Sequence, residues 1–223
     1  MRLNSKPMYN VLYCLCAIVF ILFLPFSPFF LSWLIKALPA LILAGLSRTH
    51  IPGKPGKMLS LGFLFSAAGD IFLELDPDQL FIFGLGTFLV AHLLYIRVFT
   101  FRRHLTRHRI ILIAGIILYG LILAITLYPA AGDIRPAVMV YLCIITIMGV
   151  CAGIGGPNHP FVILGAILFV ISDSLIAVNR FLVPIPAHNL MIMITYYTAQ
   201  WFIATGVLKT HPTPQPPDAH GKA

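Results

Sequence analysis

Charged side chains are scarce in this chain of 223 residues, of which only 10% are Asp, Glu, Lys or Arg. A soluble domain carries about 25%, so this chain cannot cover a globule of its size with solvated side chains. The hydrophobic share is 59%, and the mean hydropathy is +0.94. The scarcity of charge excludes a cytosolic enzyme, a secreted disulfide scaffold and a disordered regulator, and it indicates a protein embedded in a bilayer.

Acidic residues are the rarest of the charged types, with 7 Asp and Glu against 15 Lys and Arg. Such an excess of basic residues could indicate nucleic-acid binding, but here these residues stand between apolar runs. They form neither an amphipathic face nor a patch interleaved with aromatic residues. We therefore expect no nucleic-acid partner and interpret most of the basic charge as a signal of membrane topology.

Side chains for a redox or metal site are also few. The four cysteines lie in or at the ends of apolar segments, where a small soft side chain needs no redox role. The set of candidate ligand-binding residues offers His92 without the second histidine or cysteine that a zinc site needs. The sequence therefore predicts no metal and no cofactor.

What the chain has in abundance is long apolar segments. A span needs about 20 apolar residues to cross a hydrocarbon core of about 30 Å, and eight windows meet this test: 8–25, 29–46, 58–75, 79–100, 109–128, 135–153, 160–181 and 187–208. Residues that break helices separate them, including a turn expected at 52–56. The sequence predicts an all-α polytopic transmembrane bundle of eight helices, one domain over residues 1–208, followed by a disordered cytoplasmic tail over 209–223.

The basic residues give this bundle a direction. If the amino terminus is inside, 12 of the 15 Lys and Arg residues fall on one side of the membrane, as the positive-inside rule requires. Glu74, Asp76, Asp78 and Asp133 then fall on the other side. We expect both termini to be cytoplasmic, in a multi-pass protein of the bacterial inner membrane.

A few polar side chains remain inside the spans, where an ionisable group costs about 2.5 to 3.5 kcal/mol. The ionisable members are Lys36, Asp70, His92 and Asp173, and the weaker polar set is Tyr95, Tyr119, Tyr141, Asn179, Tyr196, Tyr197 and Gln200. Each has a purely structural interpretation as well. A tyrosine often packs or lies at the interface, Lys36 can snorkel or pair with an aspartate, and His92 can make one interior hydrogen bond.

The two aspartates are harder to explain structurally. Asp70 follows a run of small residues at 66–69, which leave room beside it, and Asp173 stands between Ser172 and Ser174. Two carboxyl groups in one apolar bundle cannot both stay ionised cheaply, so one of them should be a neutral acid. This arrangement keeps a proton donor beside a base. Helical spacing puts His92 with Tyr95, and Tyr196 or Tyr197 with Gln200, on shared faces that could enclose a polar pocket.

Five strings carry a family resemblance: residues 36–41, 65–73, 91–95, 172–177 and 196–200. In order and spacing they resemble the YhhN-like lysoplasmalogenase family over nearly the whole chain. One string departs from that family, because Ala37 follows Lys36 and the proline stands at position 39. The resemblance implies hydrolysis of the vinyl ether bond of a lysoplasmalogen, a lysophospholipid, to a fatty aldehyde and glycerophosphoethanolamine or glycerophosphocholine.

This chemistry suits the polar residues. A vinyl ether resists bases but hydrolyses once its β-carbon is protonated, through an oxocarbenium-like ion that water captures. The site therefore needs a protonated acid and a carboxylate. We expect Asp70 and Asp173 to form this catalytic pair, in either order. The expected substrate-binding residues are Lys36, His92, Tyr95, Tyr119, Tyr141, Asn179, Tyr196 and Gln200.

Two alternatives stay open at this point. A proton-coupled transporter of lipids or small molecules would also use carboxyl groups within the membrane. A non-catalytic lipid-binding protein would instead pair the two aspartates with Lys36 and Arg180.

Overall fold

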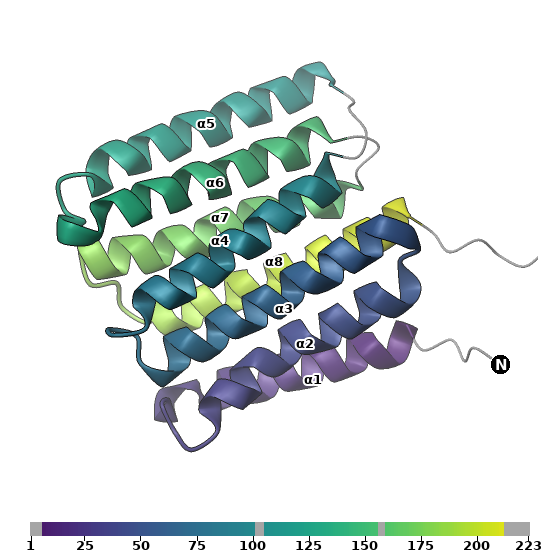
Figure 1. The fold of residues 1–223 in the computed structure, drawn as a ribbon, viewed down its shortest axis with the longest axis horizontal. Coiled ribbons are helices and arrows are strands. Elements are labelled where there is room, and N and C mark those ends of the chain that lie inside the picture. Colours follow the sequence, from purple (N-terminus) through teal and green to yellow (C-terminus); the bar gives the residue numbers. More distant parts are fainter. Residues whose placement is uncertain (1–5, 101–104, 156–158, 212–223) are drawn as a thin grey trace, which may run out of the picture.

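The computed structural model describes residues 6–100, 105–155 and 159–211, and within them the fold is helical (Figure 1). The α-helices of these residues are α1 (Lys6–Phe23), α2 (Ser32–His50), α3 (Gly53–Leu75), α4 (Phe81–Phe99), α5 (Arg107–Leu127), α6 (Arg135–Ile154), α7 (Pro160–Phe181) and α8 (His188–Thr210). Short 3-10 turns, η1 (Leu24–Phe26) and η2 (Gly132–Ile134), follow α1 and precede α6. Each predicted apolar segment coincides with one helix, so the all-α prediction is confirmed for the described residues.

Seven segments among the described residues are long and apolar enough to cross a membrane, and they contain every α-helix except α2. Lys36, Arg48 and His50 lie within the 19 residues of α2 and lower its mean hydropathy. A membrane-spanning role is therefore supported directly for seven helices.

The predicted turn at 52–56 is wrong. The helix α3 begins at Gly53, which has a φ of 71°, and Pro52 precedes it in an extended conformation. Pro55 lies within the first turn, where the missing N–H removes no hydrogen bond from the helix. As a result α3 starts five residues before the predicted position 58.

At the other end of the chain, α8 continues to Thr210. The first two residues of the expected tail are therefore helical. Residues 212–223, on which most of that prediction falls, lie outside the described residues.

The helices lie side by side and run alternately up and down the bundle (Figure 1). The most extensive contacts join α7 to α8, α2 to α3 and α3 to α4, whereas α1 and α5 lie at the two edges. The first residue of α1 and the last residue of α8 lie at the same end, which we call the terminal end (Figure 1). At the opposite distal end α3, α5 and α7 finish, and α4, α6 and α8 begin.

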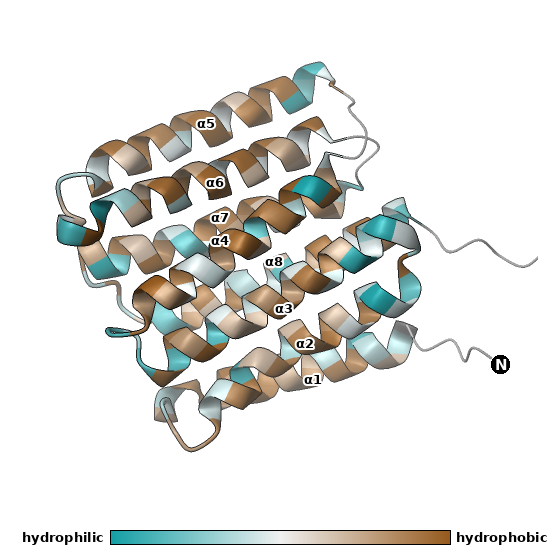
Figure 2. Ribbon diagram, in the orientation of Figure 1, coloured by the Kyte–Doolittle hydropathy of each residue, from teal (hydrophilic) through white to brown (hydrophobic). Residues whose placement is uncertain are grey.

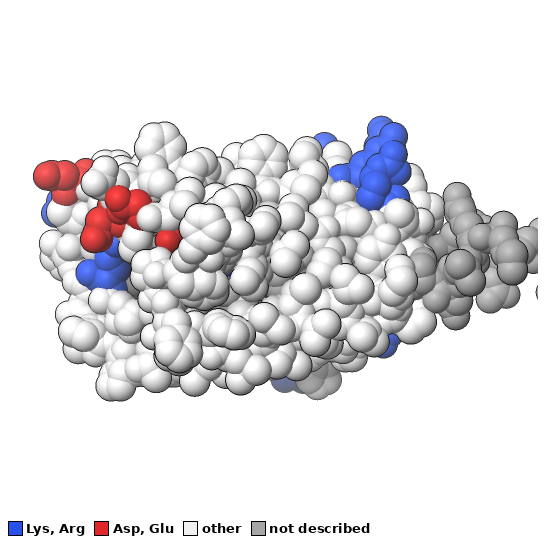
Figure 3. Space-filling view, turned by 90° about the horizontal axis from the view of Figure 1, so that it is seen from below, with Lys and Arg blue, Asp and Glu red and all other residues white. Residues whose placement is uncertain are grey.

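Side-chain character follows this arrangement. Apolar residues fill the middle of the helices, and polar residues gather toward their ends (Figure 2). On the face seen in Figure 3, acidic side chains cluster at the distal end and basic ones dominate the terminal end. Large apolar side chains such as Ile111, Leu121 and Ile125 are exposed on α5, as expected of a helix that faces lipid.

The helices α7 and α8 approach each other closely. A Cβ atom added at Gly165 would lie 2.8 Å from the carbonyl oxygen of Ala199 and 2.9 Å from the amide nitrogen of Ile203. Only glycine fits there without moving backbone, which is the use of small residues expected where membrane helices meet. This contact fixes α8 against α7, the two helices that carry Tyr196 and Asp173.

Candidate active site

Most of the polar residues predicted inside the spans lie in the middle or the distal half of the bundle. Asp70 lies five residues before the end of α3, and Asp173 lies eight residues before the end of α7. With a rise of about 1.5 Å per residue, Asp173 lies near the middle of its helix, and Asp70 lies about 9 Å from the middle of its own, toward the distal end. Tyr141 on α6 and Tyr196 on α8 enter from helices that begin at the same end.

Asp70 is buried, with 2% of its surface exposed. The Tyr196 hydroxyl donates to its Oδ2 atom at 2.7 Å, and the Gln200 Nε2 atom donates to the same hydroxyl at 2.7 Å. Tyr196 and Gln200 are four residues apart and so share one face of α8. Asp70 is thus the first member of a buried hydrogen-bonded chain, and it lines neither of the two distal-end pockets described below.

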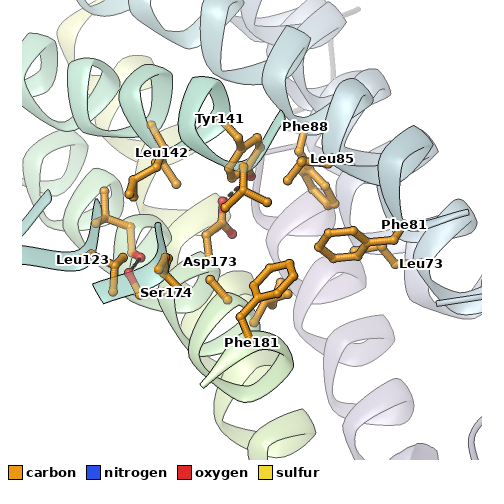
Figure 4. Close-up of a pocket in the computed structure, with 16 residues that line it drawn as sticks. Leu73, Phe81, Leu85, Phe88, Leu123, Tyr141, Leu142, Asp173, Ser174 and Phe181 are labelled. Atoms are coloured by element: carbon orange, nitrogen blue, oxygen red, sulfur yellow. Dashed lines mark hydrogen bonds between the residues drawn. The ribbon is translucent and has the colours of Figure 1, made fainter. Parts of the chain in front are cut away.

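Asp173 has partners of its own. The Tyr141 hydroxyl donates to its Oδ2 atom, as the dashed line in Figure 4 marks. The Nε2 atom of His92 lies 3.3 Å from the same oxygen and 3.0 Å from the Tyr141 hydroxyl. His92 is fully buried. Three helices, α4, α6 and α7, therefore meet at one carboxyl group.

Aromatic rings join the two aspartate clusters. The Phe169 ring centroid lies 4.8 Å from that of His92 and 5.4 Å from that of Tyr196. Phe88 also lies against Tyr196, at 5.9 Å. Among the described residues no hydrogen bond links Asp70 directly to Asp173, and the Phe169 ring packs between the two clusters.

Asp173 opens onto a pocket with walls that are almost entirely apolar (Figure 4). The empty volume of this apolar pocket, including its mouth, is about 590 Å³. Its polar members are Tyr141, Asp173 and Ser174, and the rest are Leu73, Phe81, Leu85, Phe88, Leu123, Leu127, Val138, Leu142, Ile145, Val170, Ile176, Ala177 and Phe181. An alkyl chain here would lie beside a carboxyl group.

A second, more polar pocket lies next to it at the distal end, with an empty volume of about 920 Å³. Lys36 Nζ lies 3.1 Å from Glu74 Oε2, and the Ser27 hydroxyl donates to Glu74 Oε1. The polar pocket also contains Asn179, Arg180 and His188. It shares the wall residues Leu73, Phe81 and Ile176 with the apolar pocket.

Most of the predicted site residues are brought together. Asp70, Tyr196 and Gln200 form one cluster, and His92, Tyr141 and Asp173 form the other, while Lys36 and Asn179 line the polar pocket. Tyr95 lies close by: its hydroxyl is 3.0 Å from Ser66 Oγ, and its ring is 6.2 Å from that of His92.

Tyr119 was predicted to bind substrate, but the structure places it apart from the other predicted site residues. Its side chain is 41% exposed on α5 and lines a separate hollow with Leu112, Gly115 and Ile116. The α5 helix is an edge helix, and this hollow lies between α5 and α7, away from the hydrogen bonds of both aspartate clusters. Tyr119 therefore lies outside the site.

Glu74 is the functional candidate that the sequence analysis missed. It is 8% exposed and lies one turn beyond Asp70, so both carboxyl groups are on the same face of α3. From the sequence it was counted only among the acidic residues on the far side of the membrane, but its spacing of four from Asp70 was a usable signal. Lys36 pairs with Glu74, and Arg180 lies 3.3 Å from Asp78, so the alternative that pairs these cations with Asp70 and Asp173 is wrong.

Comparison with known proteins places this site in a family. A model of the YhhN family matches residues 31–207, most of the chain. The chain belongs to the YhhN family. The prediction from five short strings is thus confirmed, and four of those strings lie on α3, α4, α7 and α8, which contribute to the two aspartate clusters.

Several YhhN relatives carry a functional name. Lysoplasmalogenase TMEM86A of Homo sapiens is 34% identical over 208 residues, which cover 86% of this chain and 85% of the relative. Lysoplasmalogenase TMEM86B of Homo sapiens is 34% identical over 207 residues, covering 90% and 85%. A lysoplasmalogenase of Mycobacterium tuberculosis (strain CDC 1551 / Oshkosh) is 29% identical over 177 residues, covering 77% and 68%. These names do not favour the transporter alternative. No solved structure matches the chain.

Proposed function

We propose that this YhhN protein hydrolyses the vinyl ether bond of a lysoplasmalogen to give a fatty aldehyde and glycerophosphoethanolamine or glycerophosphocholine. Relatives named lysoplasmalogenase, at 34% identity over most of both chains, support this activity. The observation that carries it is Asp173, a carboxyl group in the wall of a mostly apolar pocket. Such a pocket suits a lipid chain, and such a carboxyl group suits the acid that this bond requires.

The reaction adds one water across the ether. A proton is transferred to the β-carbon of the alkenyl group, and the positive charge that results is shared by the α-carbon and the ether oxygen. Water attacks the α-carbon and loses a proton to form a hemiacetal. Collapse of the hemiacetal releases the glycerol hydroxyl and leaves the aldehyde.

We assign the proton donor to Asp173, because a general acid must reach the atom it protonates. Tyr141 and His92 both lie against its Oδ2 atom, so Oδ1 is the oxygen that carries the proton toward the pocket. After transfer, these two partners stabilise the new carboxylate. That carboxylate then accepts the proton of the attacking water, and Asp173 regains its acid form.

We assign Asp70 an electrostatic role. In the reactive state that we propose, the acid is Asp173. Asp70 is then a carboxylate held by Tyr196, with Gln200 fixing that hydroxyl. In a site of low dielectric, its negative charge favours the cation that forms across the Phe169 ring.

For the membrane arrangement we propose eight spans in one domain over residues 1–208, with α2 as the eighth. It lies between α1 and α3 over its whole length (Figure 1). Basic residues at the terminal end include Arg48, Lys54, Lys57, Arg97, Arg107, Arg109 and Lys209. The positive-inside rule then puts both ends of the chain in the cytoplasm and the active site toward the opposite face of a bacterial inner membrane.

The test is aldehyde release by the purified protein in detergent. The substrates are a lysoplasmalogen, its saturated 1-O-alkyl analogue and a 1-acyl lysophospholipid, each with the same head group. Aldehyde from the lysoplasmalogen alone supports the proposal. Absence of aldehyde from a folded preparation, or equal turnover of the acyl compound, contradicts it.

A further inference from the structure

The polar pocket holds charges that the proposed chemistry does not use. Lys36 and Glu74 form an ion pair in which the side chains are only 13% and 7% exposed. Removing two charges from water costs several kcal/mol per ion, and a well-packed apolar pair would often stabilise a fold equally well. Stability is therefore a weak reason for this pair, and its position at a pocket suggests a ligand.

Both partners have spare hydrogen-bonding capacity among the described residues. An ammonium group has three donors, and Lys36 uses one of them on Glu74. A carboxylate has about four acceptor positions, and Glu74 accepts from Lys36 and Ser27. A positive and a negative group thus stand side by side in the wall of one pocket, each able to bind a further group of opposite sign.

Arg180 adds a second cation at the mouth of this pocket. Its guanidinium carbon lies 4.0 Å from the centre of the Phe81 ring, and its Nη1 atom donates to the Pro77 carbonyl at 2.9 Å. The same nitrogen lies 3.3 Å from Asp78 Oδ1, and the Asp78 side chain is largely exposed. These contacts fix the guanidinium in place and leave its other donors for a ligand.

The two pockets are neighbours across a thin apolar wall. Leu73 and Phe81 line both of them (Figure 4 shows these residues at one side of the apolar pocket). Arg180 lies over Phe81, on the polar side of that wall. An amphiphile with its alkyl chain in the apolar pocket would therefore place its polar end beside Lys36, Glu74 and Arg180.

We propose that the polar pocket is a head-group subsite for a zwitterionic phosphoamine, with the phosphate on Lys36 and Arg180 and the ammonium on Glu74. This inference rests on the proposed function for the identity of the lipid. The mixture of signs decides the class of head group. A purely anionic phosphate would face the Glu74 carboxylate, and an uncharged glycerol would make no charge-assisted hydrogen bond to either group.

The experiment measures binding, which does not depend on turnover. The probes are three saturated ethers that the enzyme cannot hydrolyse: 1-O-alkyl-glycerophosphoethanolamine, 1-O-alkyl-glycerophosphate and 1-O-alkylglycerol, titrated into protein in nanodiscs. The wild type should bind the phosphoethanolamine at least about tenfold more tightly than either of the others. A single charge-assisted hydrogen bond is strong enough to give a difference in affinity of this size.

Two variants and one control separate the charges. Glu74→Gln should abolish the preference for phosphoethanolamine over phosphate, and Arg180→Met should reduce the preference for both phosphates over alkylglycerol. Arg180 is partly exposed, so its loss leaves the core intact. Arg135→Met is the matched control, because Arg135 lies at the same end but over the Tyr128 ring, and it should preserve both preferences.

The inference is overturned if the wild type binds all three probes alike, or if both variants weaken all three equally, as a structural ion pair would. Aldehyde release from a lysoplasmalogen is measured in parallel. If aldehyde is released but no binding preference is found, the head-group subsite is contradicted and the hydrolase activity is supported. If a binding preference is found without aldehyde release, the subsite is supported and the hydrolase activity is contradicted.

Discussion

Replacing Asp173 by Asn tests the assignment of the proton donor. Asparagine has the same size as aspartate, and its side-chain oxygen can still accept from Tyr141, so the pocket keeps its shape. What is lost is the exchangeable proton. General acid catalysis contributes a factor of about 10² to 10⁴, so we expect kcat to fall by about that factor while KM changes little, as for an interaction made only in the transition state.

The neighbouring residues refine this expectation. Tyr141→Phe removes one hydrogen bond to the carboxylate that forms after proton transfer, a bond worth about 1.5 to 3 kcal/mol, so we expect a loss of roughly 10- to 100-fold in kcat. Asp70→Asn acts through charge across the Phe169 ring and should cost less than Asp173→Asn. Tyr128→Phe is the matched control, because the Tyr128 side chain is 55% exposed at the same end.

The assay is the initial rate of aldehyde formation in detergent, with thermal unfolding of each variant as a check on folding. If Asp173→Asn kept activity within tenfold of the wild type, the assignment would be refuted. A reversed order, with Asp70→Asn inactive and Asp173→Asn active, would exchange the roles of the two aspartates.

Three further predictions concern shape, fold and topology. Ala177→Trp fills the apolar pocket and should raise KM for long-chain substrates more than for short-chain ones; an equal rise for all chain lengths would contradict the pocket assignment. Gly165→Ala places a Cβ atom 2.8 Å from the Ala199 carbonyl and should destabilise the fold by about 1 to 3 kcal/mol in thermal unfolding, whereas Gly115→Ala, with nothing within 4 Å, should not. In intact bacteria, a cysteine at Gln79 should react with an impermeant maleimide, and one at Lys209 should react only after lysis; the opposite pattern would invert the proposed orientation.

The helices were predictable because length and hydropathy alone identify a membrane span. The start of α3 was not predictable in this way. In the sequence Pro55 indicates a helix break, but in the structure it lies in the first turn of α3, where a proline fits. Local composition gives no information about which turn of a helix a proline will occupy.

The site was predictable only in part, for a related reason. Asp70, Asp173 and His92 stand out because a bilayer excludes such groups. Tyr119 was misplaced because α5 is apolar all round, so its sequence does not reveal which face points inward. Glu74 and its partner Lys36 are 38 residues apart, and only the packing of α2 against α3 brings them together.

The central claim is that a carboxylic acid in the apolar pocket transfers a proton to carbon. The most direct measurement is the single-turnover rate of aldehyde formation in H₂O and in D₂O, at matched acidity and with saturating lysoplasmalogen. Transfer to carbon as the slow step predicts a clearly slower reaction in D₂O for the wild-type protein. Equal rates in the two solvents would contradict the account.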